Sequence, residues 1–207
     1  MIGLDLVYVN PLRNMPKRRL ERYAEKVCLP DEKNWVLNAE DPYLALGWLW
    51  SVKESAYKIW NRKVGKRSLN PRKFHISPSM NLPFLSKSSD TKIGQSMDEW
   101  NAHSIKIQTP EELLIAKSLL IRYGKEDYVL SLSVENPEKW PHIYWEYVCF
   151  PHSKSKQSER LREIFQERLR TEKISPSGFT HDSQISFSHD GSLIGYAFTI
   201  NKQTYEH

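Results

Sequence analysis

Two segments of the sequence carry side chains suited to binding a metal ion and phosphate. Near the start of the chain, Asp5 interrupts the apolar run Ile2–Val7, which predicts a short strand bearing one carboxylate. Further along, Leu44–Asn61 predicts a long helix in which polar residues recur at helical spacing. Mg²⁺ in proteins is held by one or two carboxylates together with substrate phosphates, and lysine binds such phosphates as a mobile point charge.

The predicted helix has a polar stripe and an apolar face. At about 100° per residue, one narrow sector holds a small residue, a hydroxyl, a carboxylate, an ammonium and an amide: Gly47, Ser51, Glu54, Lys58 and Asn61. The opposite side is apolar: Ala45, Leu49, Val52, Ala56 and Ile59. Taken alone, the stripe favours a solvated helix face with an i,i+4 Glu–Lys pair. A binding site is the alternative.

A longer pattern favours the binding site, because three separated blocks together resemble the 4′-phosphopantetheinyl transferase superfamily. That family carries a Gly-x-Asp near the start of a strand and a helix with the pattern Trp/Phe-x-x-Lys-Glu-Ala/Ser-x-x-Lys. Here these blocks are Gly3–Asp5 and Trp50–Lys58. The third block, Ile185–Gly191 followed by Tyr196–Phe198, is similar to the family's Ser-His strand-turn-strand. The resemblance is clear over residues 1–74 and 183–200.

The resemblance implies a Mg²⁺ site. Asp5 and Glu54 would be its two carboxylates, and Lys58 would contact the pyrophosphate of coenzyme A. Two-domain members carry a second acid two residues after the Asp; here that position is Val7, so a water would replace it, as in the small holo-acyl-carrier-protein synthase branch. The general base for the attacking serine is left open between Glu54 and a metal-polarised water. Lys53, at the border of the apolar face, is expected to snorkel or to pair structurally.

The resemblance also implies coenzyme A ligands. Ser188 and His189 match the family's Ser-His pair, which contacts the coenzyme, and Arg62 and Lys63 are suitable phosphate donors. The Gly-Thr-Gly that usually follows the helix in the synthase branch is replaced here by Asn61–Gly65. A structural histidine at a strand end is the competing interpretation of His189. A hydrolase triad is excluded, because adjacent residues cannot converge and no Gly-x-Ser-x-Gly elbow is present.

The implied activity is Mg²⁺-dependent transfer of 4′-phosphopantetheine from coenzyme A to a serine of an acyl or peptidyl carrier protein, with release of adenosine 3′,5′-bisphosphate. Two alternatives are a non-catalytic module of the same fold that binds carrier proteins or polyanions, and a Mg²⁺-dependent phosphoesterase. The presence of Asp5, Glu54 and Lys58 argues against the first, and the lack of further carboxylates at one site argues against the second. The carrier and its pathway, in fatty-acid or polyketide synthesis, are not specified.

Positive charge is concentrated in two clusters, although the net charge is only +5. The first is expected to dock the carrier, whose surface in such systems is acidic: Arg13, Lys17, Arg18, Arg19 and Arg22. The second follows the long helix: Arg62, Lys63, Lys66, Arg67, Arg72 and Lys73. No nucleic-acid partner is expected, because no recognisable binding module is present and the isoelectric point of about 9.1 is moderate.

Composition indicates a folded protein of the cytoplasm. With 207 residues, 39% hydrophobic residues and seven Trp, the chain can bury a core as one domain or two small ones. No apolar run approaches the ~18–20 residues of a membrane span, and the chain does not begin with the layout of a signal peptide. Cys28 and Cys149 have no spacing that pairs them and are expected to be reduced.

The elements expected from the sequence make an α+β fold. They are a strand at 2–9, helices at 16–27, 30–38 and 44–61, a strand at 72–76, a loop at 77–96, a hairpin at 113–122 and 127–135, a strand at 142–150, a helix that Ser158 could cap, and a hairpin at 185–187 and 194–200. For 109–112 a helix start competes with the hairpin. The resemblance implies that an antiparallel sheet packs around the long Trp-rich helix and that the two halves of the fold could be related by a pseudo-twofold axis.

Two subdomains are expected. Residues 1–135 resemble one transferase unit with the metal site, and 136–207 resemble a smaller second subdomain that closes the coenzyme A site. Single-unit members of the family assemble as trimers and build each site between neighbours. This longer chain could supply its own partner surface, with His189 beside Asp5 and Glu54, so a monomer is expected and a trimer is the alternative.

Overall fold

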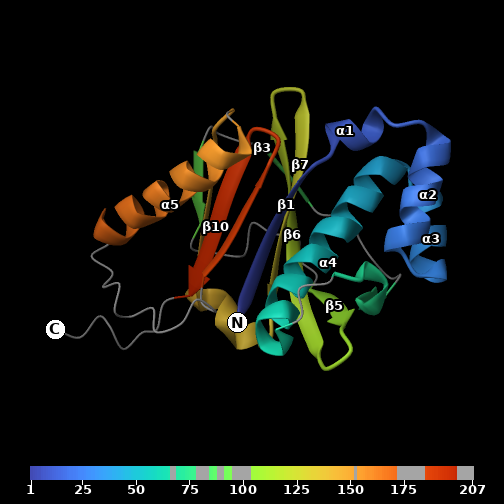
Figure 1. Ribbon diagram of the computed structural model, residues 1–207, viewed down its shortest axis with the longest axis horizontal. Coiled ribbons are helices and arrows are strands. Elements are labelled where there is room, and N and C mark those ends of the chain that lie inside the picture. The colour runs from blue at the N-terminus through green and yellow to red at the C-terminus, as the bar shows by residue number, and fades with distance from the viewer. Residues whose placement is uncertain are drawn as a thin grey trace.

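The helix that carries Glu54 and the strand that carries Asp5 lie against one another at the centre of the fold. The computed structural model describes residues 1–65, 69–77, 84–87, 91–94, 104–151, 153–171 and 185–199. Of residues 84–87, 91–94 and 154, only the backbone is described. Helix α4 (Pro42–Val64) runs along strand β1 (Ile2–Tyr8), as Figure 1 shows.

Local chemistry sets both ends of α4. The carboxylate of Asp41 accepts hydrogen bonds from the N–H groups of Tyr43 and Leu44, which caps the first turn. The helix ends at Gly65, whose φ of 70° is the left-handed conformation that glycine adopts without strain. The helix is therefore longer than the predicted 44–61 at both ends. Its N-terminal cap, Asp41, lies three residues before Leu44, and its C-terminal cap, Gly65, lies four residues after Asn61.

The first sheet is mostly antiparallel and has its apolar core on both faces. Within the described residues its strand order is β1, β7 (Glu126–Val134), β6 (Leu113–Tyr123), β5 (Ile105–Gln108) and β2 (His75–Ile76), with β3 (Phe84–Lys87) parallel to β6. The predicted hairpin is confirmed. The competing helix start is wrong, because the hydroxyl of Thr109 accepts hydrogen bonds from the N–H groups of Glu111 and Glu112 in a turn that leads into β6.

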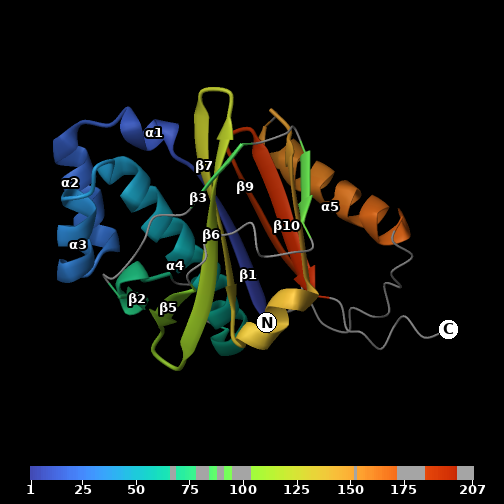
Figure 2. The ribbon, with the colours of Figure 1, turned by 180° about the vertical axis from the view of Figure 1, so that it is seen from behind.

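A second antiparallel sheet stands beside the first. Its order is β4 (Thr91–Gly94), β8 (Ile143–Cys149), β10 (Leu193–Thr199) and β9 (Ile185–Asp190). Helix α5 (Lys154–Thr171) covers it, as Figure 2 shows, and packs its apolar side chains against β10: Leu161, Ile164, Phe165 and Leu169. Because β4 comes from residues before 136, the second sheet is not built from 136–207 alone.

Short helices cover the outer side of α4. They are α1 (Asn10–Arg13), α2 (Lys17–Val27) and α3 (Pro30–Leu37), together with the 3₁₀ turn η1 (Pro71–Lys73). A second 3₁₀ turn, η2 (Pro137–His142), packs against β7 instead. The predicted strand at 72–76 is wrong at its start, because Asn70 caps η1 and only His75–Ile76 pair with β5. The predicted loop at 77–96 contains β3 and β4, and the rest of it lies outside the described residues apart from Ser77.

The α+β class with antiparallel sheets is confirmed, and the pseudo-twofold relation stays a prediction. Among the helices that the structure describes, none combines the length and the apolarity needed to cross a membrane.

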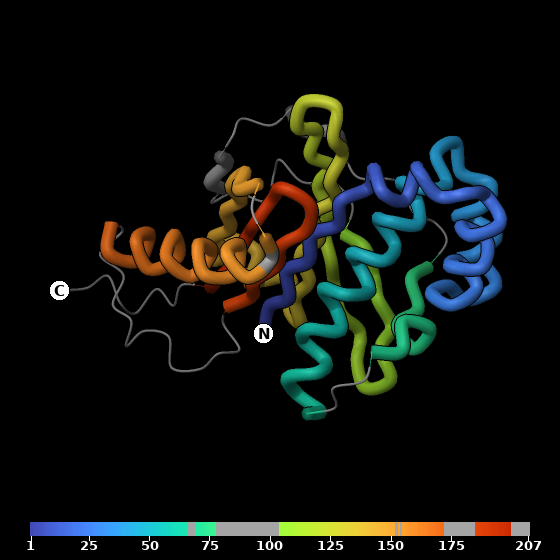
Figure 3. Tube along the Cα trace, turned by 45° about the horizontal axis from the view of Figure 1, so that its top comes forward, coloured from blue at the N-terminus to red at the C-terminus, as the bar shows by residue number. Residues whose placement is uncertain are grey.

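Figure 3 shows β1, in blue, passing between α4 and the β9–β10 hairpin. The carboxylate of β1 is thereby enclosed by elements from both ends of the chain.

Candidate active site

The polar stripe of α4 faces β1 and not the solvent. Glycine permits this close approach, because a Cβ atom added at Gly3 would lie 1.9 Å from the carbonyl oxygen of Ser55 on α4. Ser51 is fully buried, and its hydroxyl donates to the carbonyl oxygen of Asp5 over 3.3 Å. The interpretation of the stripe as a solvated helix face is therefore wrong.

Asp5 is a buried carboxylate with a lysine as its counter-ion. It is 6% exposed, and the Nζ atom of Lys58 donates to its Oδ1 over 2.9 Å. The same ammonium also donates to the carbonyl oxygens of Leu4 (2.7 Å) and Phe187 (3.3 Å), so it bridges β1 and β9. Burial raises the pKa of Asp5, and the charge of Lys58 and a hydrogen bond from Ser188 oppose that rise.

Glu54 has a carboxylate that the fold leaves unsatisfied. Its Oε2 atom is buried and has no hydrogen-bond partner among the described residues. Burial and the neighbouring charge of Asp5 raise the pKa of Glu54 to about 7, against an opposing contribution from Lys58. A buried oxygen without a donor costs free energy, and a cation shared with Asp5 would satisfy it. Two carboxylates with room for substrate phosphates fit the requirements of Mg²⁺.

The described residues offer no richer metal site. No group of three or more His, Cys, Asp or Glu gathers among them, so a bound ion would complete its shell with substrate oxygens and waters. Whether Mg²⁺ is the ion stays a prediction.

A pocket of about 310 Å³ opens at Asp5, where residues from both ends of the chain meet. Its lining is Asp5, Lys58, Ser158, Leu161, Arg162, Phe187, Ser188 and His189. The structure thus brings together four of the predicted site residues, Asp5, Lys58, Ser188 and His189, within one chain. The ring of His189 also has a local partner, because its Nε2 atom lies 3.1 Å from the hydroxyl of Ser158.

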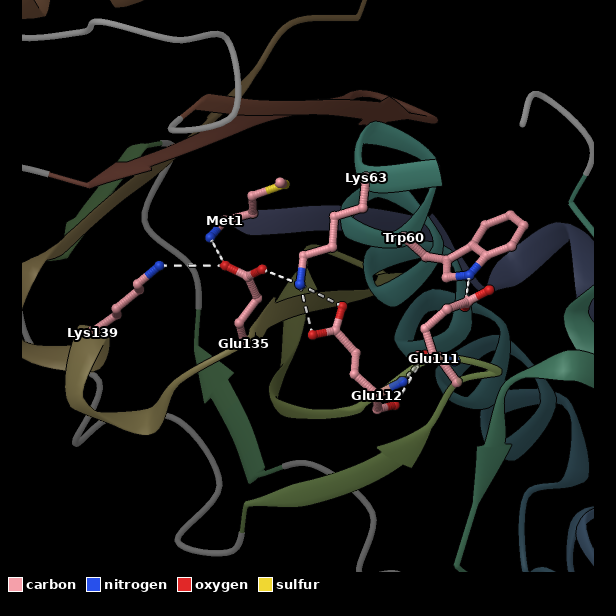
Figure 4. A network of polar contacts seen from close by, with 8 residues as sticks. Met1, Trp60, Lys63, Glu111, Glu112, Glu135 and Lys139 are labelled. Atoms are coloured by element: carbon pink, nitrogen blue, oxygen red, sulfur yellow. Dashed lines mark hydrogen bonds and ion pairs between the residues drawn. The ribbon is translucent and has the colours of Figure 1, made fainter. Parts of the chain in front are cut away.

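Arg62 and Lys63, predicted to bind the coenzyme, do not line this pocket. The guanidinium of Arg62 donates to the carbonyl oxygens of Ile2 (2.8 Å) and Ile185 (2.7 Å), so it ties β1 to β9. Lys63 forms ion pairs with Glu112 and Glu135, in the network that Figure 4 shows. Since two carboxylates already neutralise its ammonium, Lys63 would have to break these pairs to bind phosphate. Their coenzyme role therefore stays a prediction without geometric support.

Helix α5 contributes site residues that were not predicted. Ser158, expected as a helix cap, lies inside α5, because the helix begins at Lys154. It shares one helix face with Leu161 and Arg162, at i, i+3 and i+4. Among the described residues Arg162 has no ion-pair partner, so its guanidinium is available to an anion in the pocket. The spacing was visible in the sequence, but the packing of α5 beside β9 was not.

The first basic cluster divides into two parts. Lys17, Arg18, Arg19 and Arg22 are exposed on α2. Arg13 is different, because its guanidinium lies between Asp41 and Asp127 at 2.6 Å from each. The prediction that Arg13 offers its charge to a carrier is therefore corrected, since both of its partners belong to this chain.

A basic groove lies along α2. Its volume is about 750 Å³, and Arg18, Arg19 and Arg22 line it with Tyr23 and Lys26. The ring of Tyr23 contacts that of Trp50 in a tilted arrangement, with 6.0 Å between the ring centroids, and Trp50 lies one turn before Glu54 on α4. Burial raises the pKa of Tyr23, and the charge of Glu54 raises it further.

Comparison with known proteins agrees with this geometry. Residues 1–131 match the sequence profile of the 4′-phosphopantetheinyl transferase superfamily, and the chain belongs to that superfamily. Membership indicates a 4′-phosphopantetheinyl transferase, an enzyme that acts on carrier proteins. The matched segment contains Asp5, Glu54 and Lys58 and ends before α5 and β9. A search among curated proteins found no match.

Proposed function

We propose that this protein is a 4′-phosphopantetheinyl transferase of the holo-acyl-carrier-protein synthase type, which uses coenzyme A and Mg²⁺ to modify a serine of an acyl or peptidyl carrier protein. The observation that carries the proposal is the meeting of Asp5, Lys58 and the unsatisfied Glu54 beside a pocket lined by basic side chains. The proposal includes that the enzyme acts in the cytoplasm as a monomer and that its carriers serve fatty-acid or polyketide synthesis.

The roles of the residues follow from their contacts. Asp5 and Glu54 would hold Mg²⁺, which when bound offsets the negative charge of the coenzyme A pyrophosphate. Lys58 stands beside Asp5 at 2.9 Å and can move to a phosphate oxygen. Arg162 and His189 also line the pocket and can bind other phosphate oxygens of the donor.

The chain acts mainly by positioning the two substrates. The carrier serine oxygen forms a bond to the β-phosphorus of coenzyme A, and the bond from that phosphorus to the adenosine 3′,5′-bisphosphate breaks. Glu54 or a bound water accepts the serine proton. Since the transition state carries charge on its phosphoryl oxygens, cations such as Lys58 and Arg162 contribute by electrostatic stabilisation.

The proposed function is tested by assaying transfer of phosphopantetheine to a carrier protein. The protein is incubated with several apo carriers, coenzyme A and Mg²⁺, and each carrier is weighed by mass spectrometry. A gain of the phosphopantetheine mass is expected on at least one carrier and only with Mg²⁺. Binding of carriers without any gain would favour the non-catalytic module, and release of phosphate without transfer would favour the phosphoesterase.

We expect the exposed arginines of α2 to dock the carrier. The double substitution Arg18→Glu/Arg19→Glu should raise the KM for the carrier by about tenfold or more, because it places like charges against an acidic surface. The salt dependence of KM should flatten, since screening weakens attraction between exposed charges. The KM for coenzyme A should stay within twofold of the parent value.

A matched double substitution controls for charge alone. Lys106→Glu/Arg170→Glu makes the same change in net charge at two exposed positions outside the basic groove, and the KM for the carrier should hardly change. If instead the Arg18/Arg19 variant loses only affinity for coenzyme A, these residues belong to the nucleotide site and the docking assignment is wrong.

We expect the site to be complete within one chain. The pocket places Asp5 and His189 of the same molecule together, so mixing an Asp5→Ala variant with a His189→Ala variant should give no more activity than the sum of the two. Sedimentation should give a monomer mass. Recovery of a substantial part of parental activity in the mixture, with a trimer in solution, would show that neighbouring chains share the site.

A further inference from the structure

Strand β9 lies along β1 and bonds to it through side chains. The N–H of Leu4 donates to the Oγ atom of Ser186 over 2.8 Å, and the N–H of Leu6 donates to the Oγ atom of Ser188 over 3.0 Å. The N–H of Tyr8 donates to the carboxylate of Asp190 over 2.8 Å. Alternate residues of β9 thus satisfy alternate amides of β1, as the twofold repeat of strands requires.

Only the middle contact of this series also reaches the site. Besides accepting from Leu6, the hydroxyl of Ser188 donates to Oδ1 of Asp5 over 3.1 Å. Ser188 is 8% exposed and Ser186 is fully buried, so the two serines have similar surroundings. Ser186 makes the corresponding bond to Leu4, and no hydrogen bond joins it to Asp5 in the described part of the chain.

The bonding capacity of serine decides what Ser188 can do. A hydroxyl has one proton to donate, and a phosphate at neutral pH offers chiefly acceptor oxygens. Because the proton of Ser188 is already directed to Asp5, a hydrogen bond to a coenzyme phosphate would require it to leave the carboxylate. The arrangement favours a hydroxyl that serves Asp5 over one that serves the coenzyme.

We propose that Ser188 is a positioning residue that holds the Asp5 carboxylate in the orientation needed to bind the metal ion, and that it is not a coenzyme ligand. The inference rests on the proposed function, through the metal role of Asp5. Ser188 and Lys58 both donate to Oδ1 of the carboxylate, while the Leu6 amide holds the Ser188 hydroxyl itself in place. Outer hydrogen bonds of this kind commonly tune metal affinity by about 10–100-fold.

The experiment compares Ser188→Ala with Ser186→Ala. Each substitution removes one hydroxyl and leaves one β1 amide without its acceptor, so the two should lower the melting temperature similarly. Mg²⁺ is titrated by calorimetry into each protein, with coenzyme A present at saturation. Ser188→Ala should weaken Mg²⁺ binding by about tenfold or more, and Ser186→Ala should leave it within twofold of the parent. Ser188→Thr, which restores a hydroxyl, should recover most of the affinity.

The kinetic pattern separates this role from coenzyme binding. For Ser188→Ala, kcat at fixed Mg²⁺ should fall and excess Mg²⁺ should restore it, with KM for coenzyme A unchanged. A raised KM for coenzyme A with unchanged Mg²⁺ affinity would overturn the inference and return Ser188 to the coenzyme site. Equal Mg²⁺ affinities of the two alanine variants, or no Mg²⁺ binding by the parent, would also overturn it.

Failure of the inference and failure of the proposed function give different results. A protein that binds Mg²⁺ in a Ser188-dependent way but modifies no carrier would keep the inference and lose the transferase assignment. A protein that modifies a carrier with equal Mg²⁺ affinity in both alanine variants would keep the function and lose the role of Ser188.

Discussion

Glu54→Gln should abolish Mg²⁺-dependent transfer and raise the melting temperature of the protein measured without Mg²⁺. The loss of transfer, on the order of 10²–10³-fold or more, follows because one of the two carboxylates for the ion is gone. The gain in stability follows because the Glu54 carboxylate is buried, lies near Asp5, and has an oxygen without a donor. Removing that charge should stabilise the fold by about 1–2 kcal/mol.

Asp5→Ala should lose transfer to the same extent but should not share the gain in stability. Asp5 accepts hydrogen bonds from Lys58 and Ser188, so its removal takes the counter-ion from Lys58, which keeps only its backbone acceptors, and leaves the buried hydroxyl of Ser188 without an acceptor. A cost of about 1–3 kcal/mol is typical for such a loss. Glu54→Gln and Asp5→Ala are thus expected to change the melting temperature in opposite directions while lowering activity to the same extent.

Calorimetric scans without Mg²⁺ and the mass assay with Mg²⁺ measure the two effects separately. Glu40→Gln, which removes an exposed carboxylate outside the site, is the matched control and should behave like the parent in both. Parental turnover by either site variant would refute the metal assignment. A lower melting temperature for Glu54→Gln would refute the electrostatic account of Glu54 even if transfer is lost.

The sequence could predict the site residues on β1 and α4 because they lie on regular elements with a strong pattern. A helical stripe places Glu54 and Lys58 on one face whatever surrounds the helix. Which way that face points depends on tertiary packing. Gly3 and Gly47, which leave room for α4 against β1, were visible only as small residues.

Charged residues outside the patterned helix were harder to assign, because the sequence does not show which oppositely charged residue each of them pairs with in the fold. Lys63 and Arg13 looked available to ligands, yet each lies between two carboxylates. The partners of Lys63 are Glu112 and Glu135, far along the chain. Arg162 was not predicted for the complementary reason: a single arginine on an amphipathic helix carries no sign of the pocket it lines.

A second large effect is expected at Lys53, which neighbours Glu54 in the sequence but points into the core. Its side chain and that of Glu32 are both 0% exposed, and the Nζ atom of Lys53 donates to Oε2 of Glu32 over 2.5 Å. The ammonium also donates to the carbonyl oxygen of Val27 over 3.1 Å. Of the two roles expected for Lys53, structural pairing is confirmed and snorkelling is wrong.

Glu32 connects this pair to two further elements. Its Oε2 atom accepts from the N–H of Leu29 at the start of α3, over 2.7 Å, and its Oε1 atom accepts from the N–H of Ile76 in β2, over 2.8 Å. Burial lowers the pKa of Lys53, and the charge of Glu32 opposes that shift. The charge of Lys53 therefore compensates a carboxylate that the surrounding backbone holds in place.

Lys53→Met should destabilise the fold by about 3–5 kcal/mol, because it leaves the buried Glu32 carboxylate without its cation. Denaturant unfolding measures the loss. Lys33→Met is the matched control, since Lys33 pairs with Glu25 at 2.7 Å on the surface, and such exposed pairs contribute about 0–1 kcal/mol. The double variant Glu32→Gln/Lys53→Met should be more stable than Lys53→Met alone, because no unpaired charge remains in the core. A loss for Lys53→Met no greater than that for Lys33→Met would mean that Glu32 does not depend on Lys53 for its charge balance.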